Sequence, residues 1–427
     1  MLVVVGIVIF FVGLLFSIAW HELGHLLTAK MFGVKVTQYM VGFGRTLWSR
    51  KKGDTEYGIK AVPFGGYIRM IGMFPPKREE EYGRTASSAP WRVMIEDARE
   101  AASEEVTAED AHRQFYQRKP WKRIIVMAAG PVMNLILAVG IFAAILMGYG
   151  VSTPTTTVEA VSECVLPADA ADTTTCPAGA PASPAAAAGF RPGDRIVEFN
   201  GRSYAEWEQL QRAIRDSSGT VPVVVERDGQ RVHLSADLMQ TERPRLDDTS
   251  ESVTVGFLGL TPTMHLVKQD VGGVVGTMTN MVTLTAQKVI ELPQRVPDLV
   301  GAIAGGEREQ DSPVGIVGAS RLGGEVLSSD QIGVDARIIM MFNLLAGVNL
   351  SLFVFNMLPL LPLDGGHIAG AAWESIRRGF AKVVRRPDPG PFDTAKLMPV
   401  AYAVSLLFIG YSLLVLVADV VNPVTLF

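Results

Sequence analysis

Four long runs without a charged side chain divide this chain of 427 residues. They cover residues 2–20, 124–149, 338–363 and 397–418. Each run is long enough to cross a hydrocarbon core of about 30 Å as an α-helix. The hydrophobic content of the whole chain, 48%, is only modestly above that of a soluble protein, because polar stretches alternate with the runs. The sequence therefore predicts an α-helical membrane protein with four transmembrane helices.

The first run does not resemble a cleaved secretory signal peptide. It has no basic segment before it and no small-residue cleavage site, and it continues directly into two histidines. We therefore expect residues 1–32 to form the first transmembrane helix. The other three are expected at 121–150, 336–370 and 397–421.

Lysine and arginine gather near the ends of the spans in two places. One group lies between the first and second spans, and the other lies between the third and fourth. The positive-inside rule makes both loops cytoplasmic and places residues 151–335 and both termini outside. The formal net charge is -4 and no basic stripe with interleaved aromatic residues is present, so nucleic acid is not expected as a partner.

The two cytoplasmic loops differ in composition. Residues 33–74 alternate apolar and small or polar residues around glycines and a KKGD turn, which is typical of short strands and hairpins. We expect a membrane-associated β-hairpin element there. Residues 75–120 are charged and alanine-rich and predict a surface helix or a partly disordered insertion, and residues 371–396 are expected to form a cytoplasmic loop.

The outside segment 151–262 contains the stretch AAGFRPGDRIVEFNGR. Turn signals and periodicity predict strands at 195–199, 221–227 and 230–234 and a helix at 204–215. This order is similar to an α+β PDZ domain of the circularly permuted bacterial type. Such a domain either binds an extended peptide by strand addition or only blocks access, and both possibilities stay open.

Residues 263–335 follow this predicted domain and carry prolines at 293 and 297. We expect them to lie along the outer membrane surface as amphipathic helices rather than to form a fifth span.

The only two cysteines, Cys164 and Cys176, lie in the outside segment within an Ala/Pro/Thr-rich stretch. An oxidising compartment favours a disulfide between them, and the pairing would close a short loop. The alternative is two free thiols in a solvated loop.

Two histidines and a glutamate follow the first run in the stretch HELGH, residues 21–25. On a helix, His21 and His25 leave the same face and can share one metal ion, with Glu22 beside them. Ionisable side chains inside a span cost about 2.5–3.5 kcal/mol each on insertion scales and usually have a function. We therefore interpret the histidines as zinc ligands and Glu22 as a general base, in preference to side chains that extend to the interface.

A catalytic zinc site typically takes three protein ligands, so one more is needed. The best candidate is Asp364, in the stretch FNMLPLLPLDGGH at the end of the third run. The first and third spans run in the same direction, so His25 and Asp364 are expected at the same depth of the membrane. His367 and Glu22 remain alternatives for the third ligand.

Two asparagines, Asn349 and Asn356, lie seven residues apart on one face of the third span. Polar groups in a protein interior need partners. Either side chain could bind a substrate backbone or join helices by hydrogen bonds, and for Asn349 we favour the second role.

Together these motifs resemble the site-2 proteases, and most closely the bacterial regulator-of-sigma-E type and its actinobacterial relatives. The resemblance covers nearly the whole chain and is carried by HELGH, VGFGRTLW, TEYGIKAVPFGGYIRM, AAGPVMN at 128–134, the PDZ-like segment and FNMLPLLPLDGGH. One departure concerns the second proline, Pro362, which follows Pro359 by three residues instead of two and affects only the local turn.

The resemblance implies an intramembrane zinc endopeptidase of the bacterial plasma membrane with its active site toward the cytoplasmic leaflet. Its substrates would be single-span proteins such as anti-sigma factors, already clipped by a site-1 protease. His21, His25 and Asp364 would bind zinc, Glu22 would be the base, and Asn356 would contact the substrate or the transition state. The β-hairpin element would bind the unwound substrate as an added strand. The residues expected to contact it are Gly42, Phe43, Gly44, Gly65 and Gly66.

Two other classes of protein fit parts of this pattern. A membrane-anchored PDZ adaptor with an inactive metal site would have no use for Glu22 and a full ligand set. A metal transporter usually shows repeated spans and broken helices, and a peptide-binding domain would have no role in it. The protease surrounded by membrane lipid is therefore the leading hypothesis.

Overall fold

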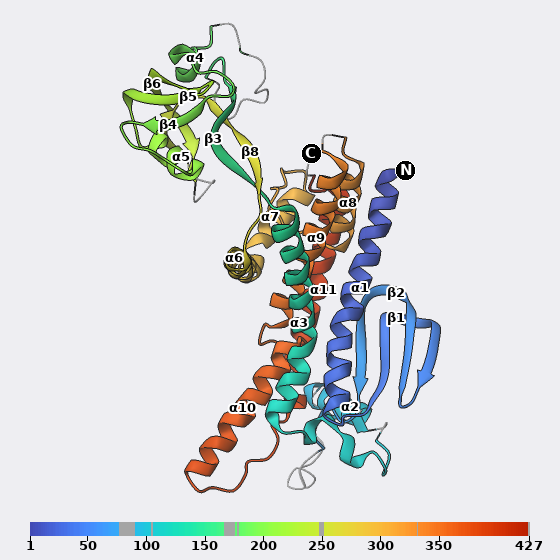
Figure 1. The fold of residues 1–427 in the computed structure, drawn as a ribbon. Coiled ribbons are helices and arrows are strands. Elements are labelled where there is room, and N and C mark those ends of the chain that lie inside the picture. The colour runs from blue at the N-terminus through green and yellow to red at the C-terminus, as the bar shows by residue number, and fades with distance from the viewer. Residues whose placement is uncertain are drawn as a thin grey trace. The chain divides into compact units, whose positions relative to one another are not determined.

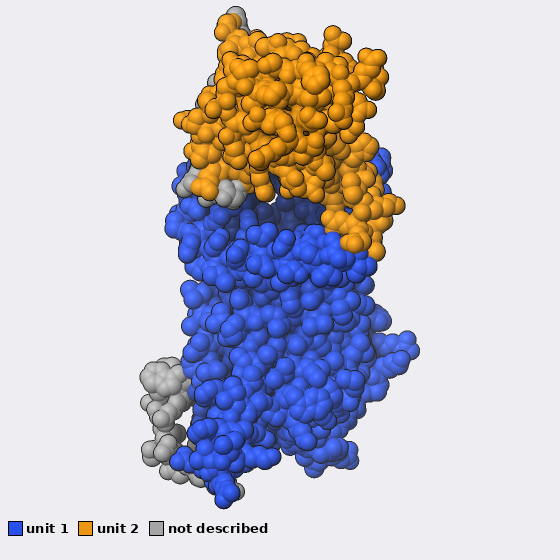
Figure 2. All heavy atoms as spheres, turned by 60° about the vertical axis from the view of Figure 1, so that its left-hand side comes forward, with its two compact units in different colours: residues 1–145, 271–427 blue, residues 146–270 orange. Residues whose placement is uncertain are grey.

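The computed structural model describes residues 1–76, 90–103, 106–165, 176, 179–246, 252–330 and 332–425. The chain forms two compact units (Figure 2). The helical unit contains Met1–Ile145 and Val271–Phe427, and the β-rich unit contains Leu146–Asp270. The β-rich unit is therefore inserted in the sequence between the two parts of the helical unit.

Four helices of the helical unit are long and apolar enough to cross a membrane, which confirms the predicted number of candidate spans within the described residues. They are α1 (Leu2–Met31), α3 (Pro120–Ala143, continued by a π-helical turn to Tyr149), α9 (Val334–Asn356) and α11 (Met398–Val421) (Figure 1). Between 17% and 33% of the most apolar window of each of these helices is buried inside the protein. Such apolar surfaces suit contact with lipid tails.

The third span differs from the continuous helix predicted over 336–370. Helix α9 ends at Asn356, and a new helix, α10 (Asp364–Val383), begins at the aspartate of the LDGG stretch. Proline lacks the backbone N–H that a helix interior needs, so Pro359 and Pro362 separate the two helices. The Leu361–Pro362 peptide bond is cis. Helix α10 also occupies much of 371–396, which was predicted as a loop.

The segment predicted to lie on the outer surface, 263–335, is largely helical. It contains α6 (Val271–Glu291), a short 3-10 turn at Leu292–Arg295, α7 (Val296–Ile303) and α8 (Ile316–Ser328). Helix α8 differs from a surface helix, because it packs into the bundle. A Cβ on Gly323 would lie 2.8 Å from Phe10 Cβ, so small residues let α8 approach α1.

Two long bent strands replace the several short strands predicted after the first span. They are β1 (Val36–Lys52) and β2 (Thr55–Met70). The first part of β1, 36–41, pairs with 66–70 on one side and with 56–59 on the other. Residues 66–70 therefore form one edge of this small sheet.

The charged insertion is more ordered than predicted in its described parts. Helix α2 (Pro90–Ser103) is followed by short 3-10 turns at Ala111–Arg113 and Phe115–Gln117. Phe115 is buried against α1 and β1, and Lys35 Nζ lies 2.5 Å from Asp110 Oδ2. The rest of the insertion, at 77–89 and 104–105, lies outside the described residues.

The β-rich unit has one six-stranded antiparallel sheet in the order β7-β6-β5-β4-β3-β8. Its strands are β3 (Val151–Val161), β4 (Arg195–Phe199), β5 (Gly219–Arg227), β6 (Gln230–Pro244), β7 (Ser252–Phe257) and β8 (Leu260–Val267). Its helices are α4 (Pro184–Ala188) and α5 (Trp207–Arg215). The strands and helix predicted between 195 and 234 all form.

Local sequence explains two features of this unit. Asp228 and Gly229 both have positive φ angles, 53° and 77°, which is the conformation of a two-residue hairpin turn between β5 and β6. Helix α5 buries Trp207, Leu210 and Ile214, whose spacing forms one apolar stripe against the sheet. In the same unit, the Sγ atoms of Cys164 and Cys176 are bonded, 2.06 Å apart.

An ion pair between buried Asp194 and partly exposed Arg227 joins β5 to the residue before β4. The Arg227 guanidinium at the end of β5 donates to both carboxylate oxygens of Asp194, at 2.7 and 2.8 Å. Burial is the largest single influence and would raise the pKa of the Asp194 carboxyl. The hydrogen bonds from Arg227 and from the Arg191 backbone N–H, together with the positive charges of both arginines, outweigh burial and hold that pKa below its usual value. The ionised carboxylate therefore stabilises the fold.

We predict that Asp194→Asn lowers the free energy of unfolding of this unit by about 1.5–3 kcal/mol, the range for hydrogen bonds to charged groups. Because the folded pKa of Asp194 lies below the unfolded one, its contribution is complete above the unfolded pKa, about 3.9, and declines as pH falls through the folded pKa. Hydrogen exchange of β4 and β5 in the full-length protein, measured against pH, checks both points. Asp228→Asn, in the exposed turn, is the control and should leave protection unchanged.

Candidate metal centre

Helix α1 presents its two histidines on one face. The ring centroids of His21 and His25 lie 4.9 Å apart, and their Nε2 atoms are 3.2 Å apart. This arrangement follows from the four-residue spacing, because residues i and i+4 are neighbours on a helix surface. His25 is buried, and His21 is partly buried.

A close approach of α3 to α1 holds the His25 ring. A Cβ on Gly24 would lie 2.4 Å from the Ala129 carbonyl oxygen, and a Cβ on Gly130 would lie 2.1 Å from His25 Nε2. Both positions therefore need glycine. The approach lets His25 Nδ1 donate to the Val126 carbonyl at 2.7 Å. A carbonyl oxygen only accepts, so the proton of a neutral His25 ring is on Nδ1 and its Nε2 carries a lone pair.

Helix α10 brings the third group from far along the chain. Asp364 is its first residue, and a Cβ on Gly365 would lie 2.1 Å from the Leu358 carbonyl oxygen. The two glycines after Asp364 thus let the first turn pack against the segment that follows α9. Further along α10, Glu374 forms a buried ion pair with Arg123 of α3, which joins this helix to the bundle.

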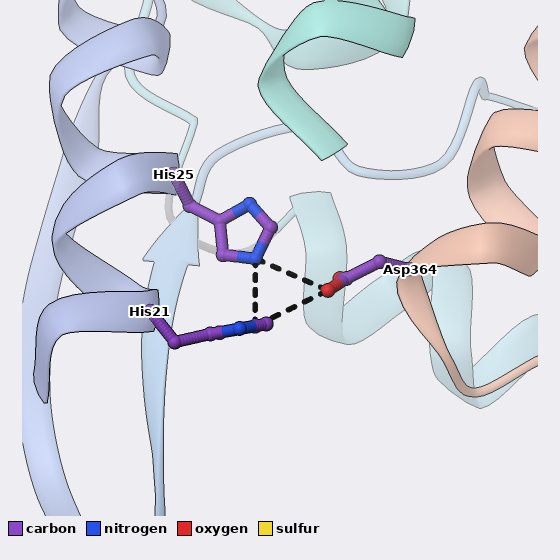
Figure 3. Close-up of side chains that lie close together, drawn as sticks. All are labelled: His21, His25 and Asp364. Atoms are coloured by element: carbon purple, nitrogen blue, oxygen red, sulfur yellow. Dashed lines mark hydrogen bonds and ion pairs between the residues drawn. The ribbon is translucent and has the colours of Figure 1, made fainter. Parts of the chain in front are cut away.

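Three ligand atoms converge at this point (Figure 3). Asp364 Oδ2 lies 3.2 Å from Nε2 of His21 and 3.2 Å from Nε2 of His25. A tetrahedral zinc ion with ligand distances of about 2.0–2.1 Å separates its ligands by roughly 3.3–3.4 Å. The observed triangle is therefore close to one face of such a tetrahedron.

The chemistry of the three atoms also fits a cation. Asp364 Oδ2 is buried and has no hydrogen-bond partner among the described residues, and His25 Nε2 is likewise an acceptor. Two acceptors 3.2 Å apart repel each other unless a metal ion or a proton lies between them. Two imidazoles and one carboxylate are a ligand set that catalytic zinc sites use, with a fourth position left for water.

The edge of the small sheet lies beside Glu22. The Ile68 backbone N–H donates to the Glu22 carboxylate. A Cβ on Gly66 would lie 2.9 Å from Ile18 Cγ2 and 3.1 Å from Glu22 Cγ, so glycine permits this contact between β2 and α1. Tyr39 of β1 also donates to the Ala19 carbonyl at 2.7 Å. The sheet therefore orients Glu22 next to the ligand triangle.

The remaining predicted substrate contacts lie in the same sheet or at the end of α9. Val41 pairs with Gly66 in the ladder, and the Phe43 ring covers Gly65, 2.6 Å from where a Cβ would be. Gly42 and Gly44 have positive φ angles of 93° and 81° and shape the bend of β1. Asn356 is the last residue of α9, and its amide nitrogen donates to the Leu352 carbonyl of its own helix.

The structure bears on the alternative third ligands and on the role of Asn349. Among the described residues, the candidate ligand group contains His21, His25 and Asp364 and includes neither His367 nor Glu22. Asn349 donates to Ser17 Oγ at 2.8 Å, which joins α9 to α1 as favoured from the sequence.

Sequence reasoning assigned no role to Val126, Gly130 and Asn134 of α3. The Asn134 side chain is fully buried, and its Nδ2 lies 3.2 Å from His21 Nδ1. These three residues recur every four positions, as do the histidines that they contact. This shared four-residue spacing in the first and second spans was the sequence signal that could have identified these residues.

We predict that Gly130→Ala displaces the His25 ring and lowers bound metal at least tenfold, because the new Cβ would overlap His25 Nε2. Metal content of the purified full-length protein after zinc loading checks this. Gly140→Ala is the matched control on the same helix, since its Cβ would meet nothing within 4 Å. Full metal content in Gly130→Ala would contradict the role given to the α1–α3 contact.

Comparison with known proteins agrees with this geometry. Residues 9–385 match the model of peptidase family M50. Zinc metalloprotease Rip1 of Mycobacterium tuberculosis is 35% identical over 100% of both chains, and Rip1 of Mycolicibacterium smegmatis is 33% identical over 99% of both. Metalloprotease MmpA of Caulobacter vibrioides is 29% identical over 88% of both chains. The chain therefore belongs to peptidase family M50, the site-2 protease family.

Proposed function

We propose that this protein is an intramembrane zinc endopeptidase that cleaves the membrane helices of single-span proteins already clipped by a site-1 protease, such as anti-sigma factors. The observation that supports it most is the triangle of His21, His25 and Asp364 with Glu22 beside it, built on helices of a membrane bundle. Ionisable groups in such a position usually serve a function. The relatives named above are zinc metalloproteases by name, which supports the same reaction.

The chain's own residues divide the work of peptide hydrolysis. His21, His25 and Asp364 would hold zinc, which when bound polarises a carbonyl and makes a water molecule more acidic. Glu22 would take the proton from the attacking water and pass it to the nitrogen of the leaving amine. The Ile68 N–H keeps the Glu22 carboxylate in place for this transfer.

The edge of the small sheet is the proposed binding place for the substrate. A helical segment must unwind before its peptide bonds can be attacked, and its freed backbone groups need hydrogen-bond partners within the membrane. Residues 66–70 lie at the sheet edge beside Glu22 and can offer such partners by strand addition. Gly42, Phe43, Gly44 and Gly65 support the bend of this sheet, and Asn356 would contact the bound backbone.

The β-rich unit is proposed to be a PDZ domain outside the cell that limits access to the site. Strands β4, β5 and β6 and helix α5 follow the predicted order, which supports this assignment. The positive-inside distribution of lysine and arginine supports an outward position for this unit and for both termini, with the active site toward the cytoplasmic leaflet.

We predict that Glu22→Gln abolishes cleavage of a clipped single-span substrate and leaves zinc content unchanged, because the base is not a ligand. Asp364→Ala should instead lower zinc occupancy, since it removes one of three ligands. Metal analysis and a gel-based cleavage assay in detergent check both variants. Normal cleavage or metal loss in Glu22→Gln would refute its role, and full zinc in Asp364→Ala would favour His367 as the ligand.

The same two measurements separate the protease from both competing functions. A membrane-anchored PDZ adaptor with an inactive metal site would cleave nothing, with or without zinc. A metal transporter would bind zinc and leave the single-span substrate intact.

We predict that removing the β-rich unit lets the enzyme cut intact substrates with bulky outer domains. Val151 of β3 pairs with Val267 of β8, so a short flexible linker can join residues 150 and 268 after deletion of 151–267. The variant should cleave clipped stubs largely as the full chain does, because the unit only restricts access. A folded, zinc-loaded deletion variant that no longer cleaves stubs would show instead that this unit binds substrate.

A further inference from the structure

The two histidines of the metal centre meet α3 in parallel ways. His25 Nδ1 contacts the Val126 carbonyl oxygen at 2.7 Å, and His21 Nδ1 contacts Asn134 Nδ2 at 3.2 Å. Val126 and Asn134 lie two helical turns apart, with Gly130 between them under the His25 ring. One face of α3 thus supplies a polar partner to the Nδ1 atom of each ring. The partner of His25 is a backbone carbonyl, and the partner of His21 is a side chain.

The identity of the partner decides which nitrogen of a neutral imidazole is free. If Nδ1 carries the proton, Nε2 has a lone pair for a metal, and if Nδ1 accepts a hydrogen bond, Nε2 carries the proton. His21 Nε2 points at Asp364 Oδ2, so metal binding requires its Nδ1 to donate. Nδ1 therefore needs an acceptor at the position of the Asn134 amide.

Asn134 can supply that acceptor. Its side chain is fully buried, and its Oδ1 has no hydrogen-bond partner among the described residues. A half-turn of the planar amide exchanges its oxygen and nitrogen with little change in shape. The oxygen then faces His21 Nδ1 and accepts its proton. The Asn134 amide is the group hydrogen-bonded to His21 Nδ1 in the structure, so the tautomer of this ring depends on the asparagine.

We propose that Asn134 is a positioning residue that holds His21 in the tautomer with a free Nε2, and so sets the zinc affinity of the site. The inference rests on the proposed function, because it assumes zinc at the triangle of His21, His25 and Asp364. Groups that accept a hydrogen bond from a ligating histidine typically change metal affinity by 10–100-fold when they are removed. His25 is independent of any such side chain, since a backbone carbonyl serves it.

The first test compares zinc affinity by chelator competition in the full-length protein. Asn134→Ala removes the acceptor and should weaken zinc binding about 10–100-fold. Asn134→Asp keeps an oxygen at the same place and should stay within about threefold of the wild type or bind more tightly. Asn134→Ala within threefold of the wild type, or Asn134→Asp as weak as Asn134→Ala, would overturn the proposal.

The matched control is Asn349→Ala. Asn349 is also fully buried, but it bonds Ser17 Oγ and the Leu345 carbonyl and contacts no ligand. This variant should lose stability while its zinc affinity remains within about threefold of the wild type. An equal loss of zinc affinity in Asn349→Ala and Asn134→Ala would point to general packing and overturn the specific role.

A second readout does not depend on a variant that might misfold. Nitrogen-15 NMR of histidine-labelled, zinc-loaded wild type reports, for each of the six histidines in the chain, which ring nitrogen carries the proton. We expect a protonated Nδ1 on His21 that is protected from exchange with water. Coordination of zinc through Nδ1 would refute the proposal. A wild type without zinc would instead contradict the proposed function.

Discussion

The contact between α1 and α3 is the interaction on which the metal centre depends. Gly24 and Gly130 bring the two helix backbones so close that a methyl group at either position would overlap the neighbouring helix or the His25 ring. At this distance the Val126 carbonyl reaches His25 Nδ1 and the Asn134 amide reaches His21 Nδ1. In lipid, where no hydrophobic force drives helices together, small residues and such hydrogen bonds are the main means of association. The same contact therefore holds the bundle together and orients two ligands.

The break after α9 completes the centre. A continuous third helix would carry Asp364 along a straight axis, whereas the proline-rich segment lets α10 start afresh with Asp364 in its first turn. The Arg123–Glu374 pair then ties α10 to α3, the helix that already supports both histidines. Helix α3 thus helps to position all three ligands, although none of the ligands is a residue of α3. Removing either partner of a buried pair leaves an uncompensated charge, which makes this tie costly to break.

The small sheet supplies the edge at which we propose the substrate binds. Its residues 66–70 approach α1 because Gly66 has no side chain, and the Ile68 N–H holds the Glu22 carboxylate. The proposed base on α1 and the proposed substrate-binding edge of β2 are therefore in direct contact. A site built in this way positions a proton acceptor and a peptide together, which is the main requirement for hydrolysis in a region with little water.

The sequence alone determined the number of candidate spans, the histidine pair and the three strands and one helix between 195 and 234 of the β-rich unit. These follow from local rules: apolar length, helical spacing and turn residues. Asp364 was the leading third ligand from the sequence, but only the tertiary structure placed it 3.2 Å from both histidines and kept His367 out of the group. The packing of α8 against α1, the break between α9 and α10 and the contacts of Gly130 and Asn134 were also decided there. Each of these features depends on which surfaces of distant segments pack together. The residue pattern within one segment does not specify which other segment it will contact.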